Sequence, residues 1–255
     1  MRRKLLQYAL PLAFFIAMSS APASADLAAG AQATMSEAVA RFDVLAKAEA
    51  AKNRPPRLAD PAAKPVFDAL FDREKILGEH PYKAADVETL LSVFSGYFGL
   101  TKVYIGFKDP AGAAADNEFN FQDELSRLAV EMVVAGGAIA QALNDYVATA
   151  PGGAVPEERK AGLAKLRLGV SQMVSGVITL LQNPRYSKEN KILLADAIAE
   201  AAPYISAILP DVDRDSISQA AMQSLLNTPP EAESLINEFM NAMNSRECSG
   251  LCALK

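Results

Sequence analysis

The chain has 255 residues, of which 51% are apolar, and carries 25 Lys and Arg against 30 Asp and Glu, a formal charge of −5. The apolar content supports a buried core, and the acidic balance argues against nucleic acid or an anionic membrane surface as a partner. Since tryptophan is absent and only 7% of residues are aromatic, no aromatic platform for sugars or bases is evident.

Residues 1–25 have the composition of a secretory leader. Residues 2–4 are basic, residues 5–18 are mostly apolar, and residues 23–25 read Ala-Ser-Ala, the small-x-small pattern that a signal peptidase accepts. The apolar stretch is shorter than the roughly 20 residues of a spanning helix, and Pro11 interrupts it. The sequence therefore predicts a cleaved signal peptide, with the cut before Asp26, and no integral membrane segment afterwards.

Cleavage would leave 22 basic and 30 acidic residues, a formal charge of −8. The predicted location is the periplasm, with release into the medium as the alternative. In this chain, residues 26–52 predict an N-terminal helix, and residues 53–65 contain four prolines and predict a linker. Residues 66–247 form the predicted helical domain, and residues 248–255 form a C-terminal tail.

Apolar residues recur at three- and four-residue steps through most of the helical domain, a spacing that predicts helices. The strand-like run 103–107 has no second strand with which to pair, so it is interpreted as the fraying end of a helix. The expected helices cover residues 66–77, 86–102, 118–148, 157–182, 189–209, 213–226 and 231–244.

The two longest helices, 118–148 and 157–182, are joined by a short loop that contains Pro151, Gly152 and Gly153. Such a connection predicts an antiparallel hairpin. The expected fold is therefore all-α, a bundle of about seven helices around this central hairpin.

Glycines inside these two helices are the least ordinary feature of the sequence. Gly136 and Gly137 interrupt the first helix, and Gly169 and Gly176 the second, although each interior glycine costs about 1 kcal/mol relative to alanine. Two interpretations remain open: the helices approach closely, or they leave room for an apolar ligand. The candidate ligand-lining residues are Met132, Val133, Gly136, Gly137, Met173 and Val177.

Cys248 and Cys252 are the two cysteines of the chain. In an oxidising compartment they predict a local disulfide that ties down the tail. A redox-active pair is disfavoured because the spacing is C-x-x-x-C and no thioredoxin-like strand pattern is nearby. Two sulfurs and His80, the lone histidine, cannot complete a tetrahedral zinc shell, so neither a metal nor a cofactor is expected.

Acidic residues at 211, 213 and 215 resemble the start of a calcium loop. The pattern then fails, because Ser216 stands where such a loop needs glycine and Met222 where it needs a bidentate glutamate. Acidic side chains in this place instead predict the N-terminus of a helix.

No nucleophile elbow, metal motif or phosphate-binding loop occurs in the chain. We therefore expect a non-enzymatic exported protein that binds another protein through a helical face. The alternative is a periplasmic carrier of a small hydrophobic or lipid ligand, held between the central helices. A hydrolase with a pair of carboxylates that are close only in space ranks last, because all-helical glycosidases usually need aromatic subsites and this chain has few aromatic residues.

Overall fold

A computed structural model describes residues 25–79, 81–108, 116–150, 155–245 and 250–253. Every regular element in these residues is helical, which confirms the all-α prediction. The predicted leader up to residue 24 and Cys248 lie outside the described residues. The helices are α1 (Ala25–Ala50), α2 (Lys64–Leu70), α3 (Arg73–Leu77), α4 (Val87–Ile105), α5 (Asn117–Asn120), α6 (Gln122–Ala148), α7 (Glu157–Gln182), α8 (Lys188–Ser206), α9 (Asp211–Ser224) and α10 (Pro230–Asn244), with 3-10 turns η1 (Ala84–Asp86), η3 (Leu225–Asn227) and η4 (Gly250–Ala253).

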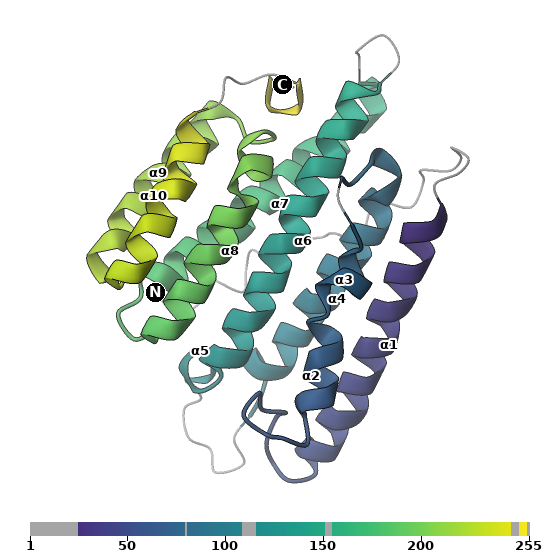
Figure 1. The fold of residues 1–255 in the computed structure, drawn as a ribbon, viewed down its shortest axis with the longest axis vertical. Helices are drawn as coiled ribbons and strands as arrows, with labels where there is room; N and C mark the ends of the chain where they lie inside the picture. Colours follow the sequence, from purple (N-terminus) through teal and green to yellow (C-terminus); the bar gives the residue numbers. More distant parts are fainter. Residues whose placement is uncertain (1–24, 80, 109–115, 151–154, 246–249, 254–255) are drawn as a thin grey trace.

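The long helices lie side by side in an elongated, layered bundle (Figure 1). One row runs α1, α4, α6, α8 and α10, each helix packing on the next. Helices α7 and α9 pack on each other and on this row, and the short helices α2 and α3 lie against α1. The core therefore extends along the row instead of closing around one point.

Helix α6 is the centre of the bundle, but its main neighbours differ from the expected ones. It packs most extensively on α8 and α4, and much less on α7. The N-terminal ends of α6 and α8 meet, since Ser187 N donates to Gln122 Oε1 at 2.8 Å and Asn190 Nδ2 donates to Asp123 Oδ1 at 2.7 Å. Helix α7 therefore runs back along the bundle, and α8 then packs on α6 in the same direction as α6. The middle of α6 is apolar on most sides, so several helices can pack on it.

By length and composition, α6 is the one described helix that could cross a membrane. Within the window that meets this test, 78% of the residues are buried in the protein. The position of α6 in the core therefore accounts for its hydropathy.

Two predicted helices are each divided in the structure. The helix expected over 66–77 breaks into α2 and α3, because Asp72 caps α3 by accepting a hydrogen bond from Lys75 N at 3.2 Å. The helix expected over 118–148 breaks at Phe121 into α5 and α6. The strand-like run 103–107 belongs to the last turn of α4 up to Ile105, as expected for a segment without a pairing strand.

The predicted linker packs against the protein in the structure. Pro55 and Pro56 are buried, and the linker also contacts a largely buried aromatic cluster. Its rings contact one another at centroid distances of 5.7–6.2 Å and come from Phe42, Phe67, Tyr104, Phe107 and Phe121. Arg57 places its guanidinium over the Phe121 ring at 5.1 Å, which joins the linker to this cluster.

The helix glycines fall into two environments. A Cβ atom at Gly137 would lie 3.1 Å from Ala201 Cβ and 3.5 Å from Ala201 Cα, so α6 and α8 approach closely there. At Gly136 the added Cβ would lie 2.6 Å from Met173 Cε, so that side chain occupies the space. Around Gly169 and Gly176, by contrast, no atom lies within 4 Å of the added position.

These environments predict opposite effects of the same substitution. We expect Gly169→Ala to raise the free energy of unfolding by about 1 kcal/mol, because alanine is the better helix former and meets open space. Gly137→Ala is expected to lower it by about 1–3 kcal/mol through overpacking against the α8 backbone. Urea unfolding midpoints of the two variants measure this, and a shift of the same sign in both would contradict it.

Candidate functional site

One face of α6 carries carboxylate and amide side chains that hold the chain before α4. Glu124 is buried, and its Oε1 accepts hydrogen bonds from Leu58 N at 2.8 Å and Arg57 Nε at 3.0 Å. Three such acceptors, Glu124, Glu131 and Asp145, are spaced by multiples of seven residues, which places them on one face of a helix. The irregular backbone thereby finds the partners that buried peptide groups require.

The same arrangement holds the entry to α4. Gln141 Oε1 accepts a hydrogen bond from Tyr82 N at 3.1 Å, and Asp145 Oδ2 accepts one from Ala84 N at 2.9 Å. Side-chain oxygens of α6 thus supply the hydrogen-bond acceptors that backbone carbonyls provide within regular secondary structure.

Glu131, in the middle of this face, is fully buried and meets two arginines. Arg73 Nε donates to its Oε2 at 2.9 Å, and Arg127 Nη2 lies 3.3 Å from its Oε1. Arg73 also lies 3.5 Å from Oε2 of Glu200 on α8. The break between α2 and α3 makes this possible, since it places Arg73 at the start of α3 opposite α6.

Burial and charge act against each other in this cluster. Burial raises the pKa of the Glu131 carboxyl, while the hydrogen bond and charge of Arg73 and the charge of Arg127 oppose the rise. Burial is the largest single effect on Arg73 and disfavours its charged form, but the hydrogen bond to Glu131 and the charges of Glu131 and Glu200 together outweigh it, so the guanidinium pKa is raised. Ionised Glu131 therefore depends on its arginine partners.

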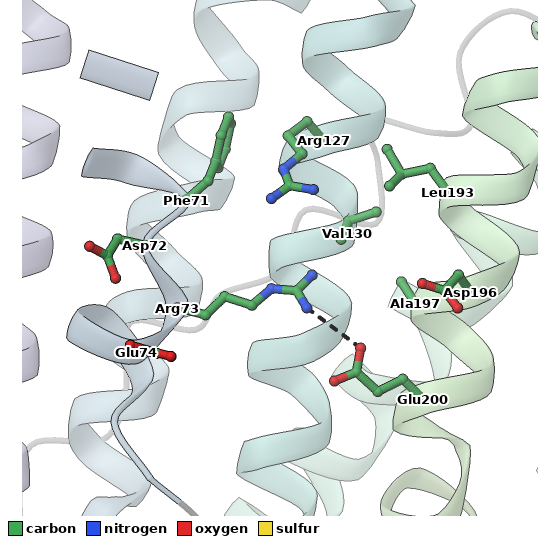
Figure 2. Close-up of a pocket in the computed structure, with 10 residues that line it drawn as sticks. All are labelled: Phe71, Asp72, Arg73, Glu74, Arg127, Val130, Leu193, Asp196, Ala197 and Glu200. Carbon is green, nitrogen blue, oxygen red and sulfur yellow. Dashed lines mark ion pairs between the residues drawn. The ribbon is translucent and has the colours of Figure 1, made fainter. Parts of the chain in front are cut away.

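A pocket of about 370 Å³ opens above this cluster, between the α2–α3 corner, α6 and α8 (Figure 2). Its volume lies near the lower end of the range of about 300–1,000 Å³ that is usual for small-molecule sites. Asp196 and Glu200 of α8 point toward the space in which the guanidinium groups of Arg73 and Arg127 lie. The lining residues are Phe71, Asp72, Arg73, Glu74, Arg127, Val130, Leu193, Asp196, Ala197 and Glu200.

The ligand-lining residues that the sequence suggested lie elsewhere, where α6 meets α7 and α8. Val133 and Val177 are buried, Met132 and Met173 are half-buried, and Met173 occupies the space beside Gly136. This geometry agrees with close helix approach, the other interpretation of the glycines. The apolar-ligand hypothesis for Met132, Val133, Gly136, Gly137, Met173 and Val177 stays a prediction.

Two other sequence hypotheses also meet the structure. Cys252 is buried in η4, but Cys248 lies outside the described residues, so the disulfide stays a prediction. The acidic run from Asp211 is the first turn of α9, where Asp211 pairs with Arg214 instead of capping a backbone N–H. Within the described ranges, no group of three or more His, Cys, Asp or Glu residues is arranged to hold a metal ion.

Helix α9 also presents an apolar surface to solvent. Val212, Met222 and Leu226 have exposed fractions of 72%, 61% and 87%. Steps of ten and four residues place them within about 80° of the helix circumference, with Leu226 in the η3 turn that continues α9. We call these three residues the α9 stripe. It lies away from the buried side of α9, which contains Ile217 and Ala221.

Sequence reasoning missed the Glu131 cluster, although one signal pointed to it. Within the apolar run 128–143 of α6, Glu131 is the sole charged residue. A carboxylate in such a run must find a partner. Nothing in the sequence identifies Arg73 as that partner, because the contact depends on the break at Asp72.

Comparison of the chain with protein-family models, with curated proteins and with solved structures finds no match.

The Glu131 cluster predicts a pH-dependent loss of stability. Arg73→Met should lower the free energy of unfolding by about 3 kcal/mol at pH 7, because it leaves a buried carboxylate with a single ion-pair partner. Arg73 holds the Glu131 pKa down, so its removal raises that pKa further. The loss should therefore be full at pH 7 and shrink as pH falls through the raised pKa and the carboxyl takes up a proton.

The control is the double variant Arg73→Met, Glu131→Gln, in which no charge is left at position 131. We expect it to recover much of the lost stability at pH 7 and to remove the pH-dependent difference from the parent. Urea unfolding between pH 5 and pH 8 measures both variants. An Arg73→Met defect that does not change with pH would contradict the role assigned to Glu131.

Proposed function

We propose that this chain is a non-enzymatic exported protein that binds a second protein through the α9 stripe. The observation that carries the proposal is the exposure of three large apolar side chains on one side of one helix. Exposed apolar groups are common singly, whereas grouped ones mark interaction surfaces. Three of the six large, exposed apolar residues found among the described residues belong to this stripe.

The charges around the stripe indicate the chemistry of the partner. Asp211, Asp213 and Asp215 lie on α9, and Glu231, Glu233 and Glu238 on the adjacent α10. Arg214, the one basic residue of these two helices, is buried. Asp211 pairs with Arg214 and Glu231 with Lys188 of α8, so the acidic rim that a partner would meet consists of Asp213, Asp215, Glu233 and Glu238, and it favours basic residues by charge complementarity.

An amphipathic helix with basic flanking residues fits both features. Its apolar face would cover Met222 and Leu226, which stand four residues apart as helix-in-groove anchors do, and would reach Val212 ten residues before them. Its Lys or Arg residues would meet the carboxylates of α9 and α10. We therefore propose a basic amphipathic helix of another protein as the occupant.

Export supports a role outside the cytoplasm. The proposal rests on residues 1–25, whose basic, apolar and small-residue zones are those of a cleaved leader. The proposed location is the periplasm, where the predicted pairing of Cys248 with Cys252 would be favoured.

The leader is tested by two neighbouring substitutions. Ser24→Gln should leave cleavage intact, because the middle position of the small-x-small pattern is tolerant, whereas Ala25→Gln should block it. Intact mass and N-terminal sequencing of the protein from the periplasm of an expressing bacterium measure this. Recovery of the unprocessed chain from the cytoplasm in the parent would contradict the proposal.

The α9 stripe is tested by site-specific photocrosslinking in cells. A photoreactive residue at position 226 should give a covalent adduct with one protein, and mass spectrometry should locate the crosslink in a basic amphipathic helix of that partner. The matched control places the photoreactive residue at Val44 of α1, which is also well exposed, at 69%. The same adduct from both positions, or a crosslink in an acidic segment, would overturn the proposal.

The purified partner then allows affinities to be compared. Met222→Ser with Leu226→Ser should weaken binding at least about tenfold, because each side chain contributes more than about 1 kcal/mol on burial. Val44→Ser should have no effect. Added salt should also weaken binding, since the rim charges are exposed, and an unchanged affinity in the double variant would refute the α9 stripe as the contact surface.

A further inference from the structure

The pocket between the α2–α3 corner, α6 and α8 carries both signs of charge, with negative charge in excess. Its lining has four carboxylates, from Asp72, Glu74, Asp196 and Glu200, and two guanidinium groups, from Arg73 and Arg127. The buried carboxylate of Glu131 lies behind the two arginines. A ligand that enters this pocket would therefore meet a field that favours a cationic group.

Several of these charges are already neutralised by neighbours. Arg73 pairs with Glu131 and Glu200, and Asp72 pairs with Lys75 at 2.6 Å. Asp196 and Glu74, by contrast, form no hydrogen bond or ion pair with any described residue, and both are exposed. Of the two, Asp196 lies on α8, across the pocket from Arg127 (Figure 2). Its carboxylate is the site at which a ligand cation gains most.

Arg127 is held in place but keeps its hydrogen-bonding capacity. Its guanidinium lies 5.0 Å from the centre of the Phe71 ring and 3.3 Å from Glu131 Oε1. Neither contact is a hydrogen bond, and Glu131 Oε1 is buried without a hydrogen-bond partner. A stacked guanidinium with free N–H groups is suited to a carboxylate, which it can bind with two parallel hydrogen bonds.

Apolar side chains line the pocket on both sides of Arg127, with Phe71 on one side and Leu193 on the other, toward Asp196 (Figure 2). Phe71, Val130, Leu193 and Ala197 come from three different elements and line the same pocket. They would accept an aliphatic group of about the size of a leucine side chain, whose burial adds to the binding energy.

We infer that this pocket binds a small zwitterion, a free α-amino acid with an aliphatic side chain. Its ammonium group would pair with Asp196, its carboxylate with Arg127, and its side chain would pack on Phe71 and Leu193. A simple anion could pair with Arg127, but the excess of carboxylates around the pocket would repel it. A simple amine could pair with Asp196, but it would form no hydrogen bond with the Arg127 guanidinium. The inference is independent of the α9 stripe, which belongs to other helices.

Three related probes test this by calorimetric titration of the purified protein. L-leucine carries both charges, isopentylamine lacks the carboxylate, and 4-methylpentanoate lacks the amine. We expect L-leucine to bind at least about tenfold more tightly than either of the others, because each lost charge-assisted hydrogen bond changes the affinity by about that factor. Equal affinities for L-leucine and isopentylamine would overturn the inference. So would the absence of L-leucine binding at about 10 mM, which is ten times the Kd of a millimolar site.

Two substitutions assign the two charges separately. Asp196→Asn should weaken L-leucine binding and leave 4-methylpentanoate binding unchanged, and it removes no contact within the described protein. Arg127→Gln should weaken L-leucine binding and leave isopentylamine binding unchanged. Asp215→Asn on α9 is the matched control, and L-leucine binding that is the same in all three variants would overturn the inference.

Discussion

The fold depends on the acceptor side chains along one face of α6. Glu124, Glu131, Gln141 and Asp145 together bind the irregular chain between α1 and α4. Buried peptide groups and charges are costly unless paired, so this segment can leave solvent only where such acceptors exist. An apolar helix would bury more hydrocarbon, but it would offer nothing to Leu58 N, Tyr82 N or the Arg73 guanidinium.

The same constraint produces the pocket. The break at Asp72 places Arg73 opposite α6, and its pairing with Glu131 fixes the α2–α3 corner beside α6 and α8. Arg127, one turn before Glu131 on α6, meets the same carboxylate and stacks on Phe71. A cluster that holds the fold together therefore also fixes the guanidinium groups of the candidate site, and rigid charged groups lose little entropy when a ligand binds.

The periodicity of the sequence predicted the long helices but not how they pack on one another. Apolar spacing identified α6, α7 and α8 because each buries a continuous side. It did not reveal the breaks at Phe71 and Phe121, since apolar residues continue across both. It also paired α6 with α7, the next helix in the chain, because spacing shows which side is buried and not what covers it. Of the residues in and behind the pocket, the sequence marks only Glu131, as a charge within an apolar run. Asp196 and Arg127 resemble ordinary surface residues of amphipathic helices.

The residues that bind the side chains of α6 lie far before α6 in the sequence, and this separation affects the order of folding. Leu58 and Arg73 find their acceptors 66 and 58 residues later, on a helix that follows α4. Long-range contacts of this kind form late, after the entropy of closing the loop has been overcome. Until α6 has been synthesised, helices α1 to α3 therefore have no partner for their buried charges and remain unable to complete a stable core. Such a chain cannot complete its core until α6 has been synthesised, a delay that would suit the proposed passage through a membrane translocation channel.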